Sequence, residues 1–98
     1  MARYLALWEA DYAKLPTDPK ERRSGYEEAI DFLKQEMKKG LIKDWGSFVG
    51  TTNGFIIYEG TEVEVGNSVQ HFVPFYIFKV YPISSLEQTE EVTKALSK

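Results

Sequence analysis

The segment Arg-Tyr-Leu-Ala-Leu-Trp-Glu, residues 3–9, decides how the rest of this 98-residue sequence is interpreted. Its side chains alternate between two faces, with Tyr4, Ala6 and Trp8 on one and Leu5 and Leu7 on the other. A run that is apolar on both faces is typical of a strand that is covered on both sides. We therefore predict a central strand here.

A second two-sided run follows later, at Phe55-Ile56-Ile57-Tyr58. It also predicts a central strand. The dipeptide Asn53-Gly54 just before it is the strongest local signal for a tight hairpin turn, so we expect an antiparallel partner around Trp45. Gly46 and Gly50 indicate that this partner is weaker and lies at an edge.

Helix signals lie between and after these strands. Asp18 followed by Pro19 predicts the start of a long helix that ends at Gly40, and a second possible start at Ser24, with Glu27 completing a capping box, stays open. Its expected buried face consists of Tyr26, Ala29, Ile30, Leu33 and Met37.

The last third of the sequence predicts three further elements. Thr61 opens a short helix over residues 61–72. Pro74 and Pro82 enclose an aromatic strand whose Lys79 is typical of an edge. Ser84 and Glu87 form a capping box for a final helix, in which Leu86, Val92 and Leu96 are available for packing.

The resulting order is strand, helix, strand, strand, helix, strand and a last helix. It predicts one α+β domain over residues 1–98, with the ferredoxin-like βαββαβ arrangement, a four-stranded antiparallel sheet and an extra C-terminal helix. In that arrangement the first and third strands are central, and these are the two strands with apolar side chains on both faces.

Two helices on one face of such a sheet leave the other face uncovered. Burying each large apolar side chain there is worth ~1.5–3 kcal/mol, and several such residues rival the stability of a whole domain. We therefore expect a homodimer that pairs through the sheet. The competing possibility is that the C-terminal helix folds back over this face of its own chain.

Three features of the sequence resemble the dimeric α+β barrel superfamily and its muconolactone-isomerase-like domains. They are Tyr-Leu-Ala-Leu-Trp at residues 4–8, Ile-Lys-Asp-Trp-Gly at 42–46 and the proline-flanked aromatic last strand. The resemblance implies a barrel made of two sheets packed face to face. The activities of the superfamily include cofactor-free oxygenation, isomerisation, haem handling and ligand sensing, and fold alone does not choose among them.

Composition excludes several classes of function. Cysteine is absent, so disulfides, thiolate metal sites and cysteine nucleophiles are excluded, and the cytoplasm is the default compartment. A net charge of −3 argues against nucleic acid and anionic membranes as partners. No apolar run has the length of a membrane span or signal peptide. We expect no cofactor and no metal, since a single histidine does not make a zinc site.

Four aromatic residues are candidate ligand-binding residues for a pocket between sheet and helices: Trp8, Trp45, Tyr58 and Tyr76. The alternatives are that they are simply core residues or form the dimer interface. The sequence favours a protein that binds a small, partly apolar molecule in such a pocket, and a structural interaction module remains an alternative.

His71 and Asp11 are the candidate catalytic residues if the protein is instead a cofactor-independent isomerase or oxygenase. His71 alone titrates near neutrality, although a histidine at a helix end also interacts with terminal carbonyls. Asp11 and Glu9 follow the first strand closely enough to form a carboxylate pair, and a solvated strand exit is the alternative.

Overall fold

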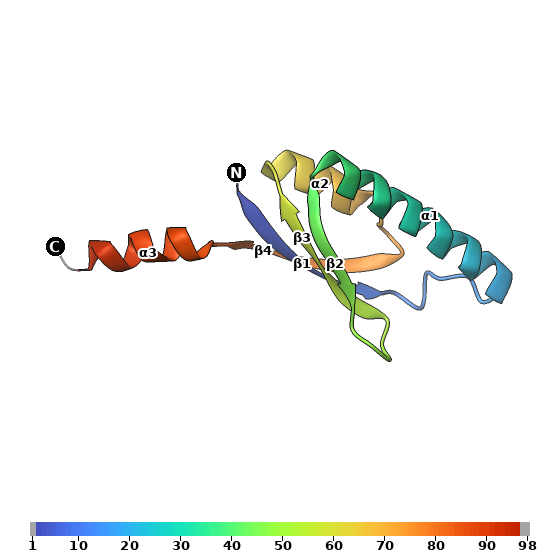
Figure 1. The fold of residues 1–98 in the computed structure, drawn as a ribbon. Coiled ribbons are helices and arrows are strands. Elements are labelled where there is room, and N and C mark those ends of the chain that lie inside the picture. Colours follow the sequence, from blue (N-terminus) through green and yellow to red (C-terminus); the bar gives the residue numbers. More distant parts are fainter. Residues whose placement is uncertain (1, 97–98) are drawn as a thin grey trace.

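The computed structural model describes residues 2–96, which form one four-stranded antiparallel sheet and three helices (Figure 1). In chain order the elements are β1 (Arg3–Ala10), α1 (Pro19–Lys39), β2 (Ile42–Ser47), β3 (Asn53–Glu59), α2 (Glu62–Gln70), β4 (Tyr76–Ile83) and α3 (Leu86–Ala95). The strands lie in the order β2-β3-β1-β4, which confirms that the first and third strands are central. This α+β architecture is consistent with the predicted ferredoxin-like arrangement.

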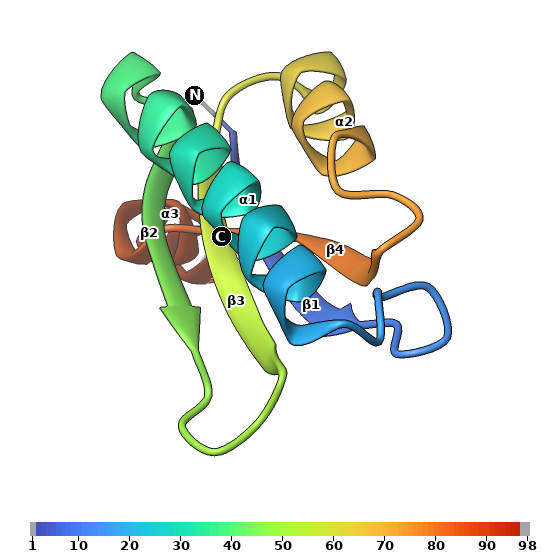
Figure 2. The same cartoon turned by 90° about the vertical axis from the view of Figure 1, so that its right-hand side faces the viewer.

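The two sides of the sheet have different surroundings. Helices α1 and α2 lie together on one side, which we call the helix face (Figure 2). Ala6, Ile56 and Tyr58 point to it and are at most 1% exposed. The opposite side, the open face, carries the other residue of each alternating pair. Its apolar side chains are Leu5, Leu7, Phe55, Ile57, Ile77, Tyr81 and Ile83.

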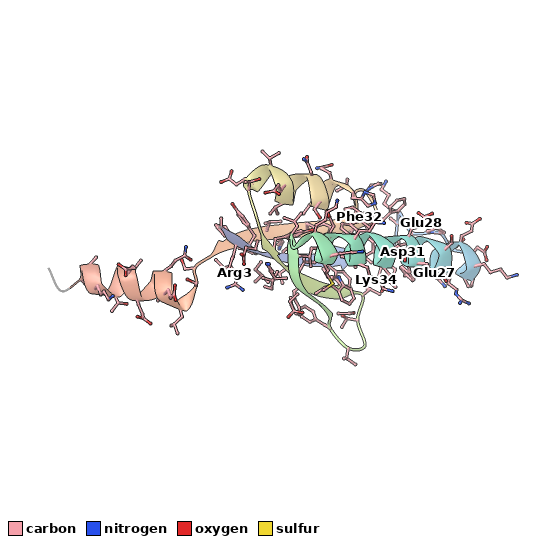
Figure 3. The ribbon with its side chains drawn as sticks, turned by 45° about the horizontal axis from the view of Figure 1, so that its top comes forward. Arg3, Glu27, Glu28, Asp31, Phe32 and Lys34 are labelled. Carbon is pink, nitrogen blue, oxygen red and sulfur yellow. The ribbon has the colours of Figure 1, made fainter. Side chains whose placement is uncertain are left out.

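The hydrophobic core lies between the helix face and the two helices that cover it. Leu33 of α1 and Val65 and Phe72 from the α2 region pack against the buried strand residues. Figure 3 shows Phe32 on the side of α1 toward α2, while Glu27 and Lys34 stand on other parts of its surface. The core therefore depends on one side of the sheet only.

Local signals set the ends of α1 as predicted. The Asp18 side chain accepts a hydrogen bond from the backbone N–H of Lys20, and Pro19 is the first helical residue. Gly40 ends the helix with φ of 85°, a left-handed conformation that glycine adopts without steric cost. The helix runs through Ser24 and Gly25 without a break, so the alternative start at Ser24 is wrong.

The buried face of α1 differs from the predicted one. Leu33 is buried and Ala29 half-buried, but Tyr26, Ile30 and Met37 are 38–46% exposed. Glu36 is buried in place of Met37. Glu36 and Met37 lie three and four residues after Leu33, so helical spacing alone does not distinguish them.

The hairpin between β2 and β3 turns earlier than predicted. The backbone N–H of Thr51 donates to the carbonyl of Phe48 at 3.0 Å, and Gly50 takes a φ of 80°. The turn therefore ends before Asn53, which begins β3 and whose carbonyl accepts from Phe48 N–H. The Asn-Gly turn prediction is wrong because Gly50 already supplies the left-handed residue.

The last two helices both begin with a capping box. Thr61 and Glu64 form that of α2, and Thr61 was predicted as its first cap. In α3 the box consists of Ser85 and Gln88, one residue later than the predicted Ser84 and Glu87. Pairing of β4 with β1 continues to Ile83 opposite Arg3, which moves the start of α3 along the chain.

Both edges of the sheet are irregular or carry polar interruptions. On β2 the register shifts between Ile42 and Asp44. On β4, Lys79 is exposed and Pro82 lacks a backbone N–H. Both strands were predicted to be edge strands, and the strand order confirms this.

Helix α3 extends away from the rest of the chain, on the side of the sheet opposite to α1 (Figures 1 and 2). It has no buried residue, and Leu86, Val92 and Leu96 are 66–83% exposed. The alternative in which α3 folds back over the open face of its own chain is therefore not what the structure shows.

Candidate functional site

A cavity of about 340 Å³ lies between the helix face and α1, and we call it the aromatic cavity. Its volume is at the lower end of the range of ligand pockets. Strands contribute Trp8, Ala10, Trp45, Ser47, Ile56, Tyr76 and Phe78, α1 contributes Tyr26, Ala29, Ile30 and Leu33, and loops contribute Thr51, Thr52 and Phe72. None of these lining residues carries a charge.

Stacked indole rings form one wall of the aromatic cavity. The rings of Trp8 and Trp45 are 5.6 Å apart with an interplanar angle of 13°. Tyr76 meets Trp8 edge to face at 5.8 Å and 86°. Such offset and edge-to-face pairs contribute roughly 0.5–1.5 kcal/mol beyond the area that they bury.

The strand register explains how two residues 37 positions apart come to stack. Trp8 lies opposite Gly54 on β3, and Trp45 lies opposite Ile56, the next residue of β3 on the same face. The Trp8 ring lies against the backbone of Gly54, where a β-carbon would overlap the ring and the Gly46 carbonyl oxygen. A glycine at position 54 therefore positions the indole.

Hydroxyl groups supply the polar part of the cavity lining. Burial raises the pKa of Tyr76, and the neighbouring Tyr26 adds to this shift, so the Tyr76 phenol stays neutral well above physiological pH. The Thr52 hydroxyl is hydrogen-bonded to the Tyr12 hydroxyl at 2.7 Å. Trp8 Nε1 is buried and has no hydrogen-bond partner within the described residues.

Tyr58 lies elsewhere than predicted. It is fully buried in the core and does not line the aromatic cavity. Its hydroxyl is 2.8 Å from that of Ser68 on α2, and burial raises its pKa to about 12. The geometry therefore gives Tyr58 a structural role, that of joining β3 to α2, and the predicted pocket keeps Trp8, Trp45 and Tyr76.

The candidate catalytic residues lie outside the aromatic cavity. His71 caps the C-terminal end of α2, and its ring stacks on Phe32 at 3.7 Å and 7°. The Asp11 carboxylate accepts a hydrogen bond from Ala13 N–H at 3.1 Å, and Glu9 is exposed. Neither His71 nor Asp11 lines this cavity, but His71 lines an adjoining recess that shares Tyr26, Ala29, Phe72 and Tyr76 with it.

A second, more polar recess lies between the C-terminal part of α1, β3 and α2, and sequence reasoning did not identify it. Glu36, Lys39, Lys43, Glu64, Ser68 and His71 are among its lining residues. Glu36 Oε2 lies 3.4 Å from Lys39 Nζ but forms no hydrogen bond. The only available signal was that Glu36 follows Leu33 at helical spacing.

Neither recess has the composition of a metal centre. Among residues 2–96, no group of three or more histidine, cysteine, aspartate and glutamate side chains is arranged to hold a metal ion. Over the same residues, no helix combines the length and apolar character needed to span a membrane.

Comparisons with known proteins supply no identity for the chain. It matches no protein-family model, and no curated protein is significantly similar to it. The function must therefore be argued from the geometry.

Proposed function

We propose that this protein binds a small, flat, uncharged and partly apolar molecule in the aromatic cavity. The observation that carries the proposal is a cavity of about 340 Å³ with a wall of stacked indoles. The lining residues Tyr26 and Ile30 are 38% and 46% exposed, so the space is open to solvent and a ligand can enter it.

The lining defines the chemical class of the ligand. Its aromatic and aliphatic side chains favour a planar hydrocarbon body, and the Tyr26 and Ser47 hydroxyls suit one or two polar substituents. A charged ligand would lose its hydration without an ion-pair partner, since no charged side chain lines the cavity.

Binding is favoured over catalysis by the positions of the titratable groups. A proton carrier must come within hydrogen-bond reach of the reacting atoms. His71 and Asp11 do not line the cavity, and the lining contains no carboxylate, imidazole or ammonium group. The isomerase or oxygenase hypothesis therefore has less support than ligand binding.

We also propose that the protein works as a homodimer that pairs through the open face. Ile77 and Tyr81 are 50% and 48% exposed there, beside half-buried Leu5 and Ile57. Contiguous apolar surface of this kind marks an interaction site on a soluble protein. Lys79 also lies on this face, opposite Leu7, and its long stem lets the ammonium group reach the rim of an interface.

Ligand binding is tested with N-phenyl-1-naphthylamine, a neutral probe that becomes fluorescent in apolar surroundings. Both tryptophans of the chain line the cavity, so energy transfer from them to the probe reports binding to the domain, and a variant that fills the cavity shows whether the probe binds there. We expect saturable transfer in the native protein and its loss in Ala29→Phe, which fills the cavity from α1. Ala13→Leu, a change in an exposed loop, is the matched control.

Equal transfer in the native protein and Ala29→Phe would place the probe elsewhere, and no transfer at all would favour the structural module. Dimerisation is tested separately by sedimentation equilibrium. A single 11.3 kDa species at micromolar concentration contradicts the homodimer and leaves the binding proposal intact.

A further inference from the structure

Helix α3 is strongly amphipathic although it contacts little of its own chain. At 100° per residue, Leu86, Thr89, Val92, Thr93 and Leu96 fall on one side, and Glu87, Glu90, Glu91 and Lys94 fall on the other. The hydroxyls of Thr89 and Thr93 donate to the carbonyls of Ser85 and Thr89, both at 3.0 Å. Both threonines can therefore present methyl groups to a partner at little polar cost.

A second apolar surface is exposed on the hairpin tip, the loop between β2 and β3. Phe48 is 47% exposed, and Val49 is fully exposed. Residues 47–52 contain no charged side chain. The ring of Phe48 stacks at 6.3 Å on Phe55, which points to the open face, so the apolar surface continues from the tip onto the sheet.

The two surfaces lie at opposite ends of the strands. Helix α3 follows Ile83, which pairs with Arg3, while the hairpin tip precedes Asn53, which pairs with Glu9. These positions are roughly 20 Å apart along β1 at the usual rise of a strand. Consider two chains whose open faces meet, related by a two-fold axis that lies between the sheets and perpendicular to the strands. This symmetry places α3 of each chain at the same end as the hairpin tip of the other chain.

We propose that α3 is an exchange arm whose Leu86, Val92 and Leu96 pack on the hairpin tip of a second copy of this chain, around Phe48 and Val49. This inference rests on the proposed dimer through the open face and specifies its geometry. The two sheets face each other with their strands antiparallel, and each chain contributes one arm and one tip.

The exposed area is sufficient for such an assembly. A standard interface buries on the order of 800 Å² on each partner. The three arm residues, the two tip residues, and Ile77 and Tyr81 of the open face are each between 47% and 101% exposed. Together these seven side chains offer apolar area on the order of that requirement. The arm and the tip are also uncharged where they meet, so no charge is buried without a partner.

A membrane surface suits the arm less well than a second copy does. Interfacial helices usually carry lysine and arginine on their polar face and bind anionic lipids. The polar face of α3 carries three glutamates and Lys94. Its charge is therefore repelled by anionic lipid, whereas it is tolerated at the water-exposed side of a protein dimer.

Engineered cysteines test the arm directly, since the chain has none of its own. Val49→Cys protein and Val92→Cys protein are mixed under reducing conditions, equilibrated and oxidised. We expect a two-chain disulfide product that contains one chain of each kind. The matched control replaces Val92→Cys with Glu91→Cys, whose side chain lies on the opposite side of α3, and is expected to give much less product.

A second measurement does not depend on disulfide geometry. We expect Val92→Glu combined with Leu96→Glu to raise the dimer dissociation constant by about tenfold or more, whereas Glu91→Gln leaves it unchanged. Circular dichroism confirms that each variant is folded.

The outcomes of these experiments distinguish the exchange-arm proposal from the proposal of a dimer through the open face. A dimer that forms no Val49–Val92 link and is unaffected by Val92→Glu with Leu96→Glu overturns the arm but keeps the open-face interface. An intrachain link in a Val49→Cys, Val92→Cys double variant, with no link between chains, shows that the arm folds onto its own tip and also overturns the proposal. A monomer at all concentrations refutes both.

Discussion

The two faces of the sheet are built from neighbouring residues of the same strands, yet one face packs against α1 and α2 and the other is uncovered. Ile56 is 1% exposed beneath α1, while the adjacent Ile57 is half-buried on the open face. Alternation along a strand makes this possible, because one residue step reverses the direction of the side chain. The comparison teaches that one strand can supply the core with one face and leave apolar side chains exposed on the other, where we propose that a second chain binds.

The sharpest way to test this comparison is a pair of matched truncations. We expect Ile56→Ala to lower the free energy of unfolding by about 2–5 kcal/mol, because it opens a cavity in a packed core. Ile57→Ala removes the same atoms from a half-buried position, so we expect it to lower the free energy of unfolding of a single chain by less. Urea unfolding measures both, and it is followed at several protein concentrations because an effect of Ile57 through the dimer depends on concentration. Equal losses at low concentration contradict the distinction between the faces.

A pH titration tests the most deeply buried polar contact of the helix face. The pKa of Tyr58 is about 12 in the folded chain and about 10 when unfolded, so the folded state holds this proton more tightly. This difference contributes about 2–3 kcal/mol to the free energy of unfolding. The contribution is fully present below pH 10 and is lost as the pH rises toward 12. Unfolding of the native protein and Tyr58→Phe is compared across this range, where the variant should lose less stability. Parallel curves for the two proteins would falsify this linkage.

Two glycines of adjacent strands provide a third comparison between the faces. A β-carbon at Gly54 meets backbone and the Trp8 ring, whereas one at Gly46 meets only the ring of Phe55 on the open face. We expect Gly54→Ala to cost about 1–3 kcal/mol and to change tryptophan emission, because the Trp8 ring must move. Gly46→Ala should cost less, since the Phe55 side chain can rotate. Unaltered emission in Gly54→Ala argues against its positioning role.

The smallest expected effect concerns the helix that covers the buried face. No atom lies within 4 Å of a β-carbon built at Gly25, and the residue sits inside α1. Gly25→Ala should therefore raise stability by about 0.5–1 kcal/mol through helix propensity alone. Thermal unfolding measures it, and loss of stability would indicate a contact to Gly25 that the structure does not contain.

Sequence reasoning was most successful where a local signal has a single interpretation. Apolar side chains on both faces of residues 3–9 and 55–58 identified the two central strands, and Asp18, Gly40 and Thr61 marked helix ends. These signals depend on backbone chemistry within a few residues. They therefore hold without knowledge of the tertiary structure.

Other features of the fold and of the candidate site depend on the tertiary structure, and the sequence pattern did not predict them. Glu36 and Met37 both fit the spacing of α1, but the structure buries only the glutamate. Trp8, Trp45 and Tyr76 were expected to share a pocket, but the role of Gly54 in positioning Trp8 depends on the strand register. The direction of α3 is set at the end of β4, where no local motif specifies it. The competition between Gly50 and Asn53-Gly54 is instead local, because Gly50 takes the left-handed conformation within the turn and Asn53 begins β3.

The two edges of the sheet limit how large an assembly of chains can grow. Strand β2 has a register shift, and β4 carries Lys79 and Pro82. A straight, unprotected edge accepts another strand, and repeated addition leads to open-ended fibres. Both edges of this sheet are interrupted, which disfavours hydrogen bonding between sheets from chain to chain. In the proposed dimer the open face is covered by the partner, so association through that face ends at two chains.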